Sequence, residues 1–245
     1  MPAKKPRRTS ERILDVTLAM FNRFGEPNVS TSQLCAELGI SPGNLFYHHP
    51  TRDALIEGLF ERYRQQVEQV LRNDTLGPTG GTAPPLLNTE AGFSPALVRL
   101  ADACRGVAQA AWGHRFLFRD LNDLVARQRV LEDELPGLLR RQAAWLQGQV
   151  QALAWDSASP TDAQLRLWMG PMLASLTHCM GLDGALDPRE RLRPTDAQAV
   201  ERAVWRALGL LLSALPPTEQ QTLQQHLSRG EALGPDPWWL ASDGG

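Results

Sequence analysis

Residues 30–50 contain the signals for two short helices separated by a single turn, a pattern that few folds accommodate. Ser30 and Gln33 form a capping box, in which each side chain bonds the backbone N–H of the other residue. A helix is therefore predicted to begin after Ser30 and to end at Leu38. Gly39 follows, and it fits the left-handed conformation that closes many helices, because a residue with a Cβ atom would be strained there.

A second short helix is predicted to begin after Ser41, which can cap it, and to end near His48. Pro42 takes its first position, where the missing N–H costs nothing. An amphipathic helix over 10–24, ended by Gly25, precedes the pair. Two short helices joined by a tight turn and packed on a preceding helix form a helix-turn-helix. We expect the seam between the three helices to be filled by Leu34, Leu38, Ile40 and Leu45. Ala36 is small where the two short helices would approach closely.

The rest of the chain is also predicted to be helical. Ala, Leu, Arg and Gln are abundant while β-branched residues are scarce, which favours an all-α fold. Further helices are predicted at about 50–72, 95–127, 130–155, 161–182, 195–213 and 216–227, with capping boxes at Thr161…Gln164 and Thr195…Gln198 and a loop at 181–194. The predicted domains are a basic arm at 1–9, a helix-turn-helix domain with its connecting helix at 10–72, a Gly/Pro/Thr-rich loop at 73–94, a larger helical domain at 95–228 and a tail at 229–245.

Composition and motifs exclude several classes of protein. Cys35, Cys104 and Cys179 are widely spaced and form no CxxC pair, which argues against a disulfide framework and a structural zinc site and favours the cytoplasm. No apolar run approaches the ~20 residues of a membrane span, so no membrane partner is expected. Nucleophile elbows, phosphate-binding glycine loops and HExxH motifs are missing from the sequence, so we expect no catalytic residue, metal or cofactor.

The charge is distributed unevenly. The first twelve residues hold five basic side chains and one acidic one, although the whole chain has a net charge of −2. A basic arm on a slightly acidic body is typical of nucleic-acid binding, and a merely solvated tail is the alternative. The residues that would reach along a groove are Lys4, Lys5, Arg7 and Arg8.

Residues 10–57 resemble the DNA-binding domain of the TetR/AcrR-type transcriptional regulators. The resemblance rests on Phe24-Gly25, on Val29-Ser30-Thr31, on LCAELGIS at 34–41 and on GNLFYHHPTRDAL at 43–55. It covers roughly one fifth of the chain densely. The remainder matches in layout, because this family carries a variable all-helical domain for ligand binding and dimerisation.

The resemblance implies specific contacts with DNA. The N-terminal part of the second short helix would enter the major groove, presenting Ser41, Gly43, Asn44, Phe46, Tyr47 and His48. Asn44 can read a base edge with its amide. Backbone and hydroxyl donors at the start of the preceding helix would hold phosphate, from Ser30, Thr31 and Ser32. Arg52 occupies the place of a phosphate-binding lysine in the family. Phe46 stands where the family commonly has a tyrosine whose hydroxyl contacts phosphate.

The adjacent histidines at 48 and 49 also allow a metal-site interpretation. Neighbouring side chains on a helix point about 100° apart, so both rarely coordinate the same metal ion. No Cys, Asp or Glu cluster lies near them in the sequence to complete a ligand set. His49 stands where the family has a buried phenylalanine, and we expect it to pack inside, whereas His48 is expected to contact DNA.

The second domain is expected to hold a small-molecule effector that is partly apolar. Helical bundles bind such ligands in apolar pockets with a few convergent polar groups. The candidates are Trp112, Phe116, Arg119, Asn122, Trp145, Trp168, Met172 and His178. A homodimer is expected through the helices at about 161–182 and 195–213. Their apolar faces consist of Leu165, Trp168, Met169, Met172, Leu173 and Leu176 on the first and Val200, Val204, Ala207, Leu208, Leu211 and Leu212 on the second, with Gly170, Ala174, Ala203 and Ala207 small enough for close approach.

These features predict a homodimeric transcriptional regulator that represses from a palindromic operator in double-stranded DNA and is released by its effector. Two recognition helices one DNA turn apart bind a palindrome better than one. Two alternatives stay open: a nucleic-acid-binding helical protein without small-molecule control, and a helical enzyme or carrier of small molecules.

Overall fold

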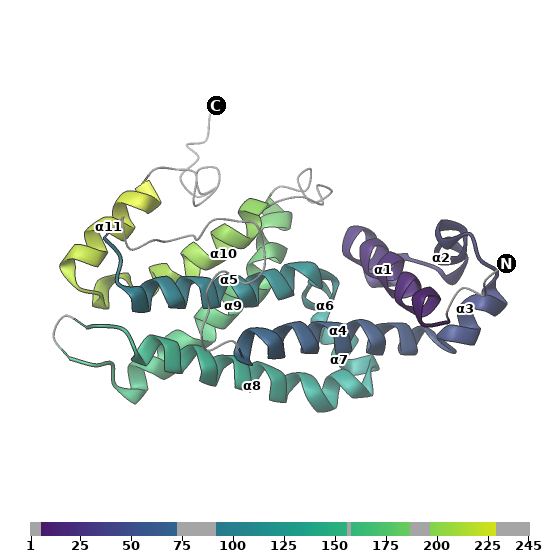
Figure 1. Ribbon diagram of the computed structural model, residues 1–245, viewed down its shortest axis with the longest axis horizontal. Helices are drawn as coiled ribbons and strands as arrows, with labels where there is room; N and C mark the ends of the chain where they lie inside the picture. Colours follow the sequence, from purple (N-terminus) through teal and green to yellow (C-terminus); the bar gives the residue numbers. More distant parts are fainter. Residues whose placement is uncertain (1–5, 73–91, 156–157, 187–196, 229–245) are drawn as a thin grey trace. The chain divides into compact units, whose positions relative to one another are not determined.

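The computed structural model describes residues 6–72, 92–155, 158–186 and 197–228. Throughout these ranges the regular elements are helices, and no strand occurs in them (Figure 1). The predicted all-α fold is confirmed. The predicted tail at 229–245 lies outside the described residues, as does nearly all of the predicted loop at 73–94. Thr195 of the capping box predicted at Thr195…Gln198 also lies outside them.

The helices follow one another along the chain as Figure 1 labels them. The first part contains α1 (Pro6–Phe24), the short 3₁₀ turn η1 (Glu26–Asn28), α2 (Thr31–Leu38), α3 (Pro42–His48) and α4 (Arg52–Arg72). The second part contains α5 (Pro95–Gly113), α6 (Arg115–Arg119), α7 (Leu121–Arg127), α8 (Arg129–Gln151), α9 (Asp162–Leu186), α10 (Ala197–Gly209), the 3₁₀ turn η4 (Leu212–Ala214) and α11 (Pro217–Ser228).

The helix predicted over 95–127 is three helices, and that prediction is corrected. The chain leaves helical geometry at His114 and again at Asp120, between α5, α6 and α7. A tertiary contact replaces helical hydrogen bonds at the first break. Asn22 Nδ2 donates to the Gly113 carbonyl at 2.7 Å, and Asn22 Oδ1 accepts from the Phe116 N–H at 3.1 Å.

Two other predicted boundaries move. α1 begins at Pro6, so residues 6–9 of the predicted arm are helical. α9 continues to Leu186 and therefore replaces the first part of the loop predicted at 181–194. The capping box at the start of α9 forms as predicted, because the Gln164 N–H donates to Thr161 Oγ1 at 3.3 Å and the Thr161 N–H donates to Gln164 Oε1 at 2.9 Å.

Contacts divide the chain into two compact units. Unit 1 contains Met1–Gln66 and Gly113–Leu138, and unit 2 contains Val67–Trp112 and Leu139–Gly245. The sequence places residues 113–138 within the larger helical domain at 95–228, whereas in the structure they belong with the helix-turn-helix.

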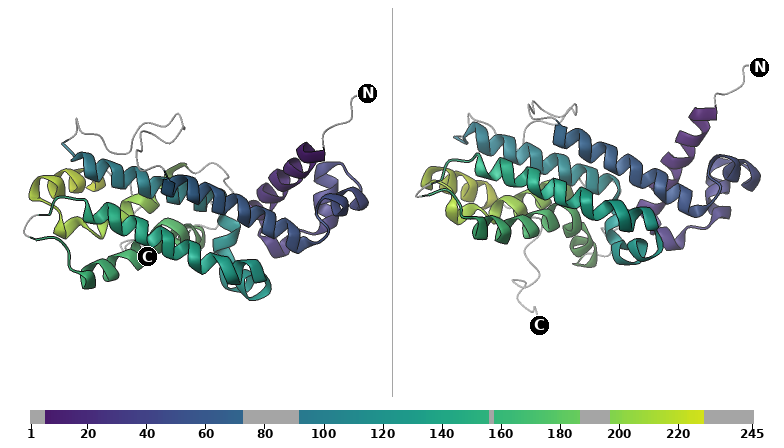
Figure 2. Two further views of the ribbon diagram at one scale, coloured as in Figure 1. Left: turned by 60° about the horizontal axis from the view of Figure 1, so that its bottom comes forward. Right: turned by 90° about the horizontal axis from the view of Figure 1, so that it is seen from below.

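Unit 1 is built around α1 and the first part of α4. α1 contacts α2, α3 and α6, and the three N-terminal helices lie side by side in every view (Figures 1 and 2). Its largest fully buried side chains include Ile13, Phe21, Leu34, Leu45, Leu59, Phe60, Tyr63 and Phe116. The Phe21 and Phe116 ring centroids are 5.4 Å apart, so α6 contributes directly to the core of unit 1.

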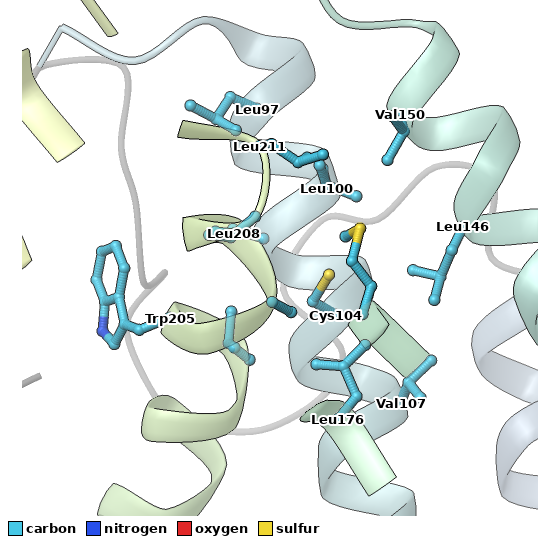
Figure 3. Packing of buried hydrophobic residues seen from close by; sticks show 14 of the residues in the cluster. Leu97, Leu100, Cys104, Val107, Leu146, Val150, Leu176, Trp205, Leu208 and Leu211 are labelled. Atoms are coloured by element: carbon cyan, nitrogen blue, oxygen red, sulfur yellow. The ribbon is translucent and has the colours of Figure 1, made fainter. Parts of the chain in front are cut away.

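Unit 2 has a core formed by α5, the later part of α8, α9 and α10 (Figure 3). Figure 3 shows Leu100 and Cys104 of α5 facing Leu146 and Leu208 from the neighbouring helices. Burial raises the pKa of the Cys104 thiol to about 12, so this cysteine is an apolar core residue.

The same core accounts for most of the apolar residues that were expected to form a dimer surface. Leu165, Met169, Met172, Leu176, Val200, Ala203, Val204, Ala207, Leu208 and Leu211 are all buried within unit 2. α9 and α10 therefore pack on each other with these faces. The prediction is corrected in that respect: apolar periodicity marks a buried face without showing whether the same chain or a second copy covers it.

Along the described parts of the chain, none of the helices has the combination of length and apolarity that crossing a membrane requires.

Candidate nucleic-acid interface

The turn between α2 and α3 forms as the sequence predicts. Gly39 lies in the left-handed region, with φ 64° and ψ 37°, and its N–H donates to carbonyls in the last turn of α2. The Ile40 N–H bonds the Cys35 carbonyl at 3.1 Å. Ser41 caps α3 by accepting a hydrogen bond from the Asn44 N–H at 3.3 Å. The direction in which α3 leaves the turn is therefore set by local hydrogen bonds.

The inner faces of α2 and α3 are buried against α1. Leu34, Leu38 and Leu45 are at most 4% exposed, which confirms their predicted place in the seam. Ile40 is half-buried, and Ala36 is exposed, so Ala36 is not the small contact residue that the sequence suggested. Burying only one side of α3 leaves its other side available.

The outer face of α3 carries the predicted DNA-contacting residues. Ser41, Gly43 and Asn44 are exposed, Phe46 is 45% exposed and Tyr47 is 79% exposed. His48 is half-buried, and its ring meets the Tyr47 ring edge-on with centroids 5.1 Å apart. From Pro27 to Thr51 the sequence has one acidic residue, Glu37, so little negative charge opposes phosphate on these two helices.

The start of α2 combines an internal capping box with an open first turn. The Ser30 hydroxyl donates to Gln33 Oε1 at 2.9 Å and accepts from the Gln33 N–H at 3.3 Å. The cap thus occupies the Ser30 side chain. Ser32 is exposed and Thr31 is half-buried, at the helix end where backbone N–H groups attract anions.

Arg52 has a different position from the one that its place in the motif implies. Its Nε donates to Glu26 Oε1 at 2.5 Å, its Nη1 donates to the Val29 carbonyl at 2.6 Å and its Nη2 donates to the Glu26 carbonyl. All three guanidinium nitrogens therefore bind inside the protein. Arg52 joins the start of α4 to η1 through these bonds, which gives it a structural role, and the phosphate contact that its place in the motif implies stays a prediction.

Glu26 is the centre of this arrangement. Its side chain is 1% exposed, and Arg127 of α7 donates to its Oε2 at 2.9 Å, opposite Arg52 on Oε1. Arg127 also bonds Asp123, and these hydrogen bonds with Asp123 and Glu26 raise the pKa of Arg127. A buried carboxylate needs such partners, because an uncompensated charge inside a protein is very costly.

Two further contacts join the α6–α7 segment to the helix-turn-helix. Arg119 Nη2 donates to the Asn22 carbonyl at 2.7 Å, near the end of α1. Gln128 Nε2 donates to Asp53 Oδ1 at 2.6 Å, in the first turn of α4. No signal in the sequence indicates Asn22, Glu26 and Arg127, because no local pattern links residues that lie so far apart in the chain.

His48 and His49 lie in different surroundings, whereas a shared metal ion would require their rings to come together. His49 is 8% exposed, and its Nε2 lies 3.0 Å from Ser10 Oγ of α1. Burial lowers the pKa of the His49 imidazole from its ordinary value of 6.5. Its predicted packing inside the domain is confirmed, with a polar contact in addition. Among the residues described, no three His, Cys, Asp or Glu side chains gather into a possible metal site.

The residues predicted to bind an effector are divided between the two units. Phe116, Arg119 and Asn122 belong to unit 1, where the first two pack on α1 and Asn122 is exposed. The others belong to unit 2: Trp112, Trp145, Trp168, Met172 and His178. Trp168 stacks on Trp155 with centroids 5.7 Å apart, Met172 is buried in the core, and His178 Nδ1 lies 2.7 Å from Thr177 Oγ1. The eight residues therefore do not belong to one compact unit.

Comparison with known protein families gives two matches. Residues 13–59 match the family model described as bacterial regulatory proteins, tetR family. Residues 82–223 match a second model of the same family, described as a bacterial transcriptional repressor. Curated relatives include the nucleoid occlusion factor SlmA from three strains of Actinobacillus pleuropneumoniae, 25% identical over 123 residues that make up 49% of this chain and 57% of the relative. The chain thus spans little more than half the length of these relatives.

Solved structures show the same fold. A TetR-family transcriptional regulator from Marinobacter aquaeolei VT8 superposes with a TM-score of 0.67 at 20% identity, over 93% of this chain and 98% of that one. A transcriptional regulator from Rhodococcus sp. Rha1 superposes with a TM-score of 0.53 at 16% identity, over 86% of this chain and 98% of that one. At these identities the likeness concerns the fold alone.

Proposed function

Because this chain belongs to the TetR family of bacterial transcriptional regulators, we propose that it is a ligand-responsive repressor that binds a palindromic operator as a homodimer. The observation that carries the proposal is the state of α3. One side of this short helix is sealed against α1 through Leu45, while Asn44, Phe46 and Tyr47 stand exposed on the other. A helix held in this way at a tight turn presents its outer face to the major groove.

Asn44 is the residue on α3 best suited to read a base. Its side chain is exposed, and an amide can form a bidentate pair of hydrogen bonds with N6 and N7 of adenine. Phosphate would be held by the first turn of α2 around Thr31 and Ser32, and by Arg8, exposed in the first turns of α1. Lys4 and Lys5 lie outside the described residues. The sequence-based proposal that they reach along a DNA groove is kept.

The proposed dimer uses the outer face of α9. Leu167 is 69% exposed, and Gly170 and Ala174 are exposed one and two turns further along the same face. An exposed leucine followed by small residues suits the close approach of an identical helix from a second copy. This face remains after the core has taken the other apolar side of α9.

The proposed effector binds unit 2 and is aromatic or apolar with a hydrogen-bond acceptor. Trp155 and Trp168 form a stacked pair there. The ring N–H groups of Trp145 and Trp155 are buried with no acceptor among the described residues. Buried donors of this kind are normally satisfied, so an acceptor oxygen on a ligand would find partners at either ring.

The effector's influence on DNA binding would pass through α6 and α7. These helices continue the chain directly from α5 and into α8, two of the helices that form the core of unit 2. Within unit 1 they are fixed to the DNA-binding helices by Asn22, Glu26 and Asp53. A ligand that favours another arrangement of α5 and α8 would therefore lower the fraction of dimers whose two helix-turn-helix domains fit the operator.

Binding to DNA fragments tests the proposal. The purified chain is expected to protect a palindromic sequence in genomic fragments, and Asn44→Ala is expected to change the sequence preference at one position per half-site. Gln33→Ala, which removes only a cap, is the matched control on α2 and should preserve the preference. Failure of the wild-type chain to protect any DNA would favour a helical enzyme or carrier instead.

Ligand control is tested separately with a library of aromatic carboxylates and phenols at saturating concentration. An effector should raise the melting temperature and weaken operator binding together. A protein that binds its operator but responds to no compound in either assay would be a regulator without small-molecule control.

A further inference from the structure

The outer face of α3 holds one large apolar ring at the place where the protein would meet DNA. Phe46 is 45% exposed, and Gly43 lies one turn earlier on the same side of the helix. Leu45 faces the core, so Phe46 is not part of the seam that holds the helix. A single exposed aromatic is common on protein surfaces; the position of this one on the recognition helix sets it apart.

The surroundings of Phe46 leave room for a base edge. Phe46 follows Gly43 by three residues, so the two positions lie on neighbouring turns of the same side of α3. Gly43 has no side chain, and a Cβ there would meet only Ser41 Oγ, at 4.0 Å. The N-terminal part of a recognition helix is the part that comes nearest to the bases.

The chemistry of a phenyl ring narrows its partner. Phe46 has no hydroxyl, so it cannot donate a hydrogen bond to phosphate, and covering a phosphate with an apolar ring would cost solvation. On the base edges of the major groove the one apolar group is the C5 methyl of thymine. Contact with that methyl removes apolar surface of both partners from water, which is favourable.

We propose that Phe46 reads a thymine in each operator half-site through the thymine C5 methyl. The proposal rests on the proposed function, because it requires α3 to lie in the major groove. It names the base chemistry that α3 selects.

The test uses the full chain and a duplex of about 30 base pairs that it selects from a random pool. Each thymine of the duplex is replaced in turn by deoxyuridine, which removes only the methyl. One position per half-site is expected to weaken wild-type binding about fourfold, the value of one buried methyl. Phe46→Ala is expected to bind the parent duplex more weakly and to lose all sensitivity to deoxyuridine at that position.

Two variants separate methyl recognition from a loss of structure. Phe46→Leu keeps an apolar side chain and should retain part of the sensitivity. Tyr47→Phe removes a neighbouring hydroxyl and should retain all of it. Because Phe46 is exposed, the melting temperature of Phe46→Ala should equal that of the wild type.

Two outcomes would overturn the inference: a wild-type protein that selects a duplex yet tolerates deoxyuridine at every position, or a Phe46→Ala protein that keeps the full sensitivity to deoxyuridine. Failure to select any duplex from the pool would instead refute DNA binding itself, so the two failures are distinguishable.

Discussion

At the scale of single residues, Glu26 shows how a buried charge determines the role of its neighbours. The carboxylate receives Arg52 on one oxygen and Arg127 on the other, and it is 1% exposed. The motif places a cation at position 52 where it would meet phosphate. The buried carboxylate competes for that cation without the screening by water and salt that weakens a surface contact.

Arg52→Gln is therefore expected to lower the free energy of unfolding by about 2 kcal/mol, because it leaves Glu26 with one of its two cationic partners. The value lies below that of a fully buried pair because the Arg52 side chain is 30% exposed. Urea denaturation measures it. The control is Arg129→Gln, whose side chain is 91% exposed and pairs with Asp133 at 3.7 Å, and which should change stability by less than about 0.5 kcal/mol. Unchanged stability of Arg52→Gln with a reduced salt dependence of DNA binding would restore the phosphate role.

His49 is expected to make stability depend on pH. Because burial lowers its pKa in the folded state, the unfolded chain binds a proton below about pH 6.5 that the folded chain does not. Stability should thus fall as pH drops from 6.5 toward the folded-state pKa, by at most about 1.4 kcal/mol per pH unit. His49→Phe should reduce this slope, with His178 supplying a remainder of the same sign. Equal slopes for both proteins in melting experiments between pH 5 and 7.5 would contradict the expectation.

At the scale of elements, the α2–α3 segment contains one glycine that the turn requires and another that lies on the exposed face of α3. Gly39 and Gly43 lie four residues apart, yet one has a positive φ of 64° and the other is in helical conformation. A Cβ at Gly39 would meet nothing within 4 Å, so substitution there would affect the backbone alone. The two glycines therefore serve different purposes.

Gly39→Ala should cost about 1–2 kcal/mol of stability, because it forces an L side chain into the left-handed region. Gly43→Ala should leave stability unchanged or raise it by up to about 1 kcal/mol, since alanine suits a helix better than glycine. Gly43→Ala should nevertheless weaken operator binding, because a methyl would stand on the face that approaches DNA. Thermal melts and DNA titrations on both variants distinguish these effects. A Gly43→Ala protein with undiminished affinity would show that the backbone does not approach the bases there.

At the scale of the whole molecule, the apolar faces of α9 and α10 are buried in the core of their own chain and are not available to a second copy. Their buried leucines, valines and methionines close the core of unit 2, as Figure 3 illustrates around Leu176 and Leu208. Among the described side chains of α9, Leu167 is the large apolar one that remains exposed for association. An interface of small residues around one leucine is more sensitive to charge than a broad apolar surface.

Leu167→Glu is expected to convert the dimer to a monomer without loss of helix content, because this side chain is 69% exposed in the single chain. Sedimentation velocity gives the mass, and circular dichroism gives the helix content. Operator affinity should fall sharply, since each half-site would then bind alone. Gln151→Glu introduces a charge at another exposed position, on α8, and should leave the dimer intact. A dimeric Leu167→Glu protein would place the interface elsewhere.

Local sequence patterns are enough to predict the helical class, the two caps and the turn at Gly39, because these depend on hydrogen bonds and backbone conformations within three or four residues. The motif also identifies the residues on the outer face of α3, and the structure leaves most of them exposed there. Tertiary contacts are what break the predicted helix over 95–127 at His114, join α6 and α7 to the helix-turn-helix and turn Arg52 inward. Each of these follows from a contact across a long stretch of chain, such as Asn22 with Phe116 at a separation of 94 residues and Glu26 with Arg127 at 101. No local periodicity encodes such contacts, since they depend on which polar groups folding brings together away from water.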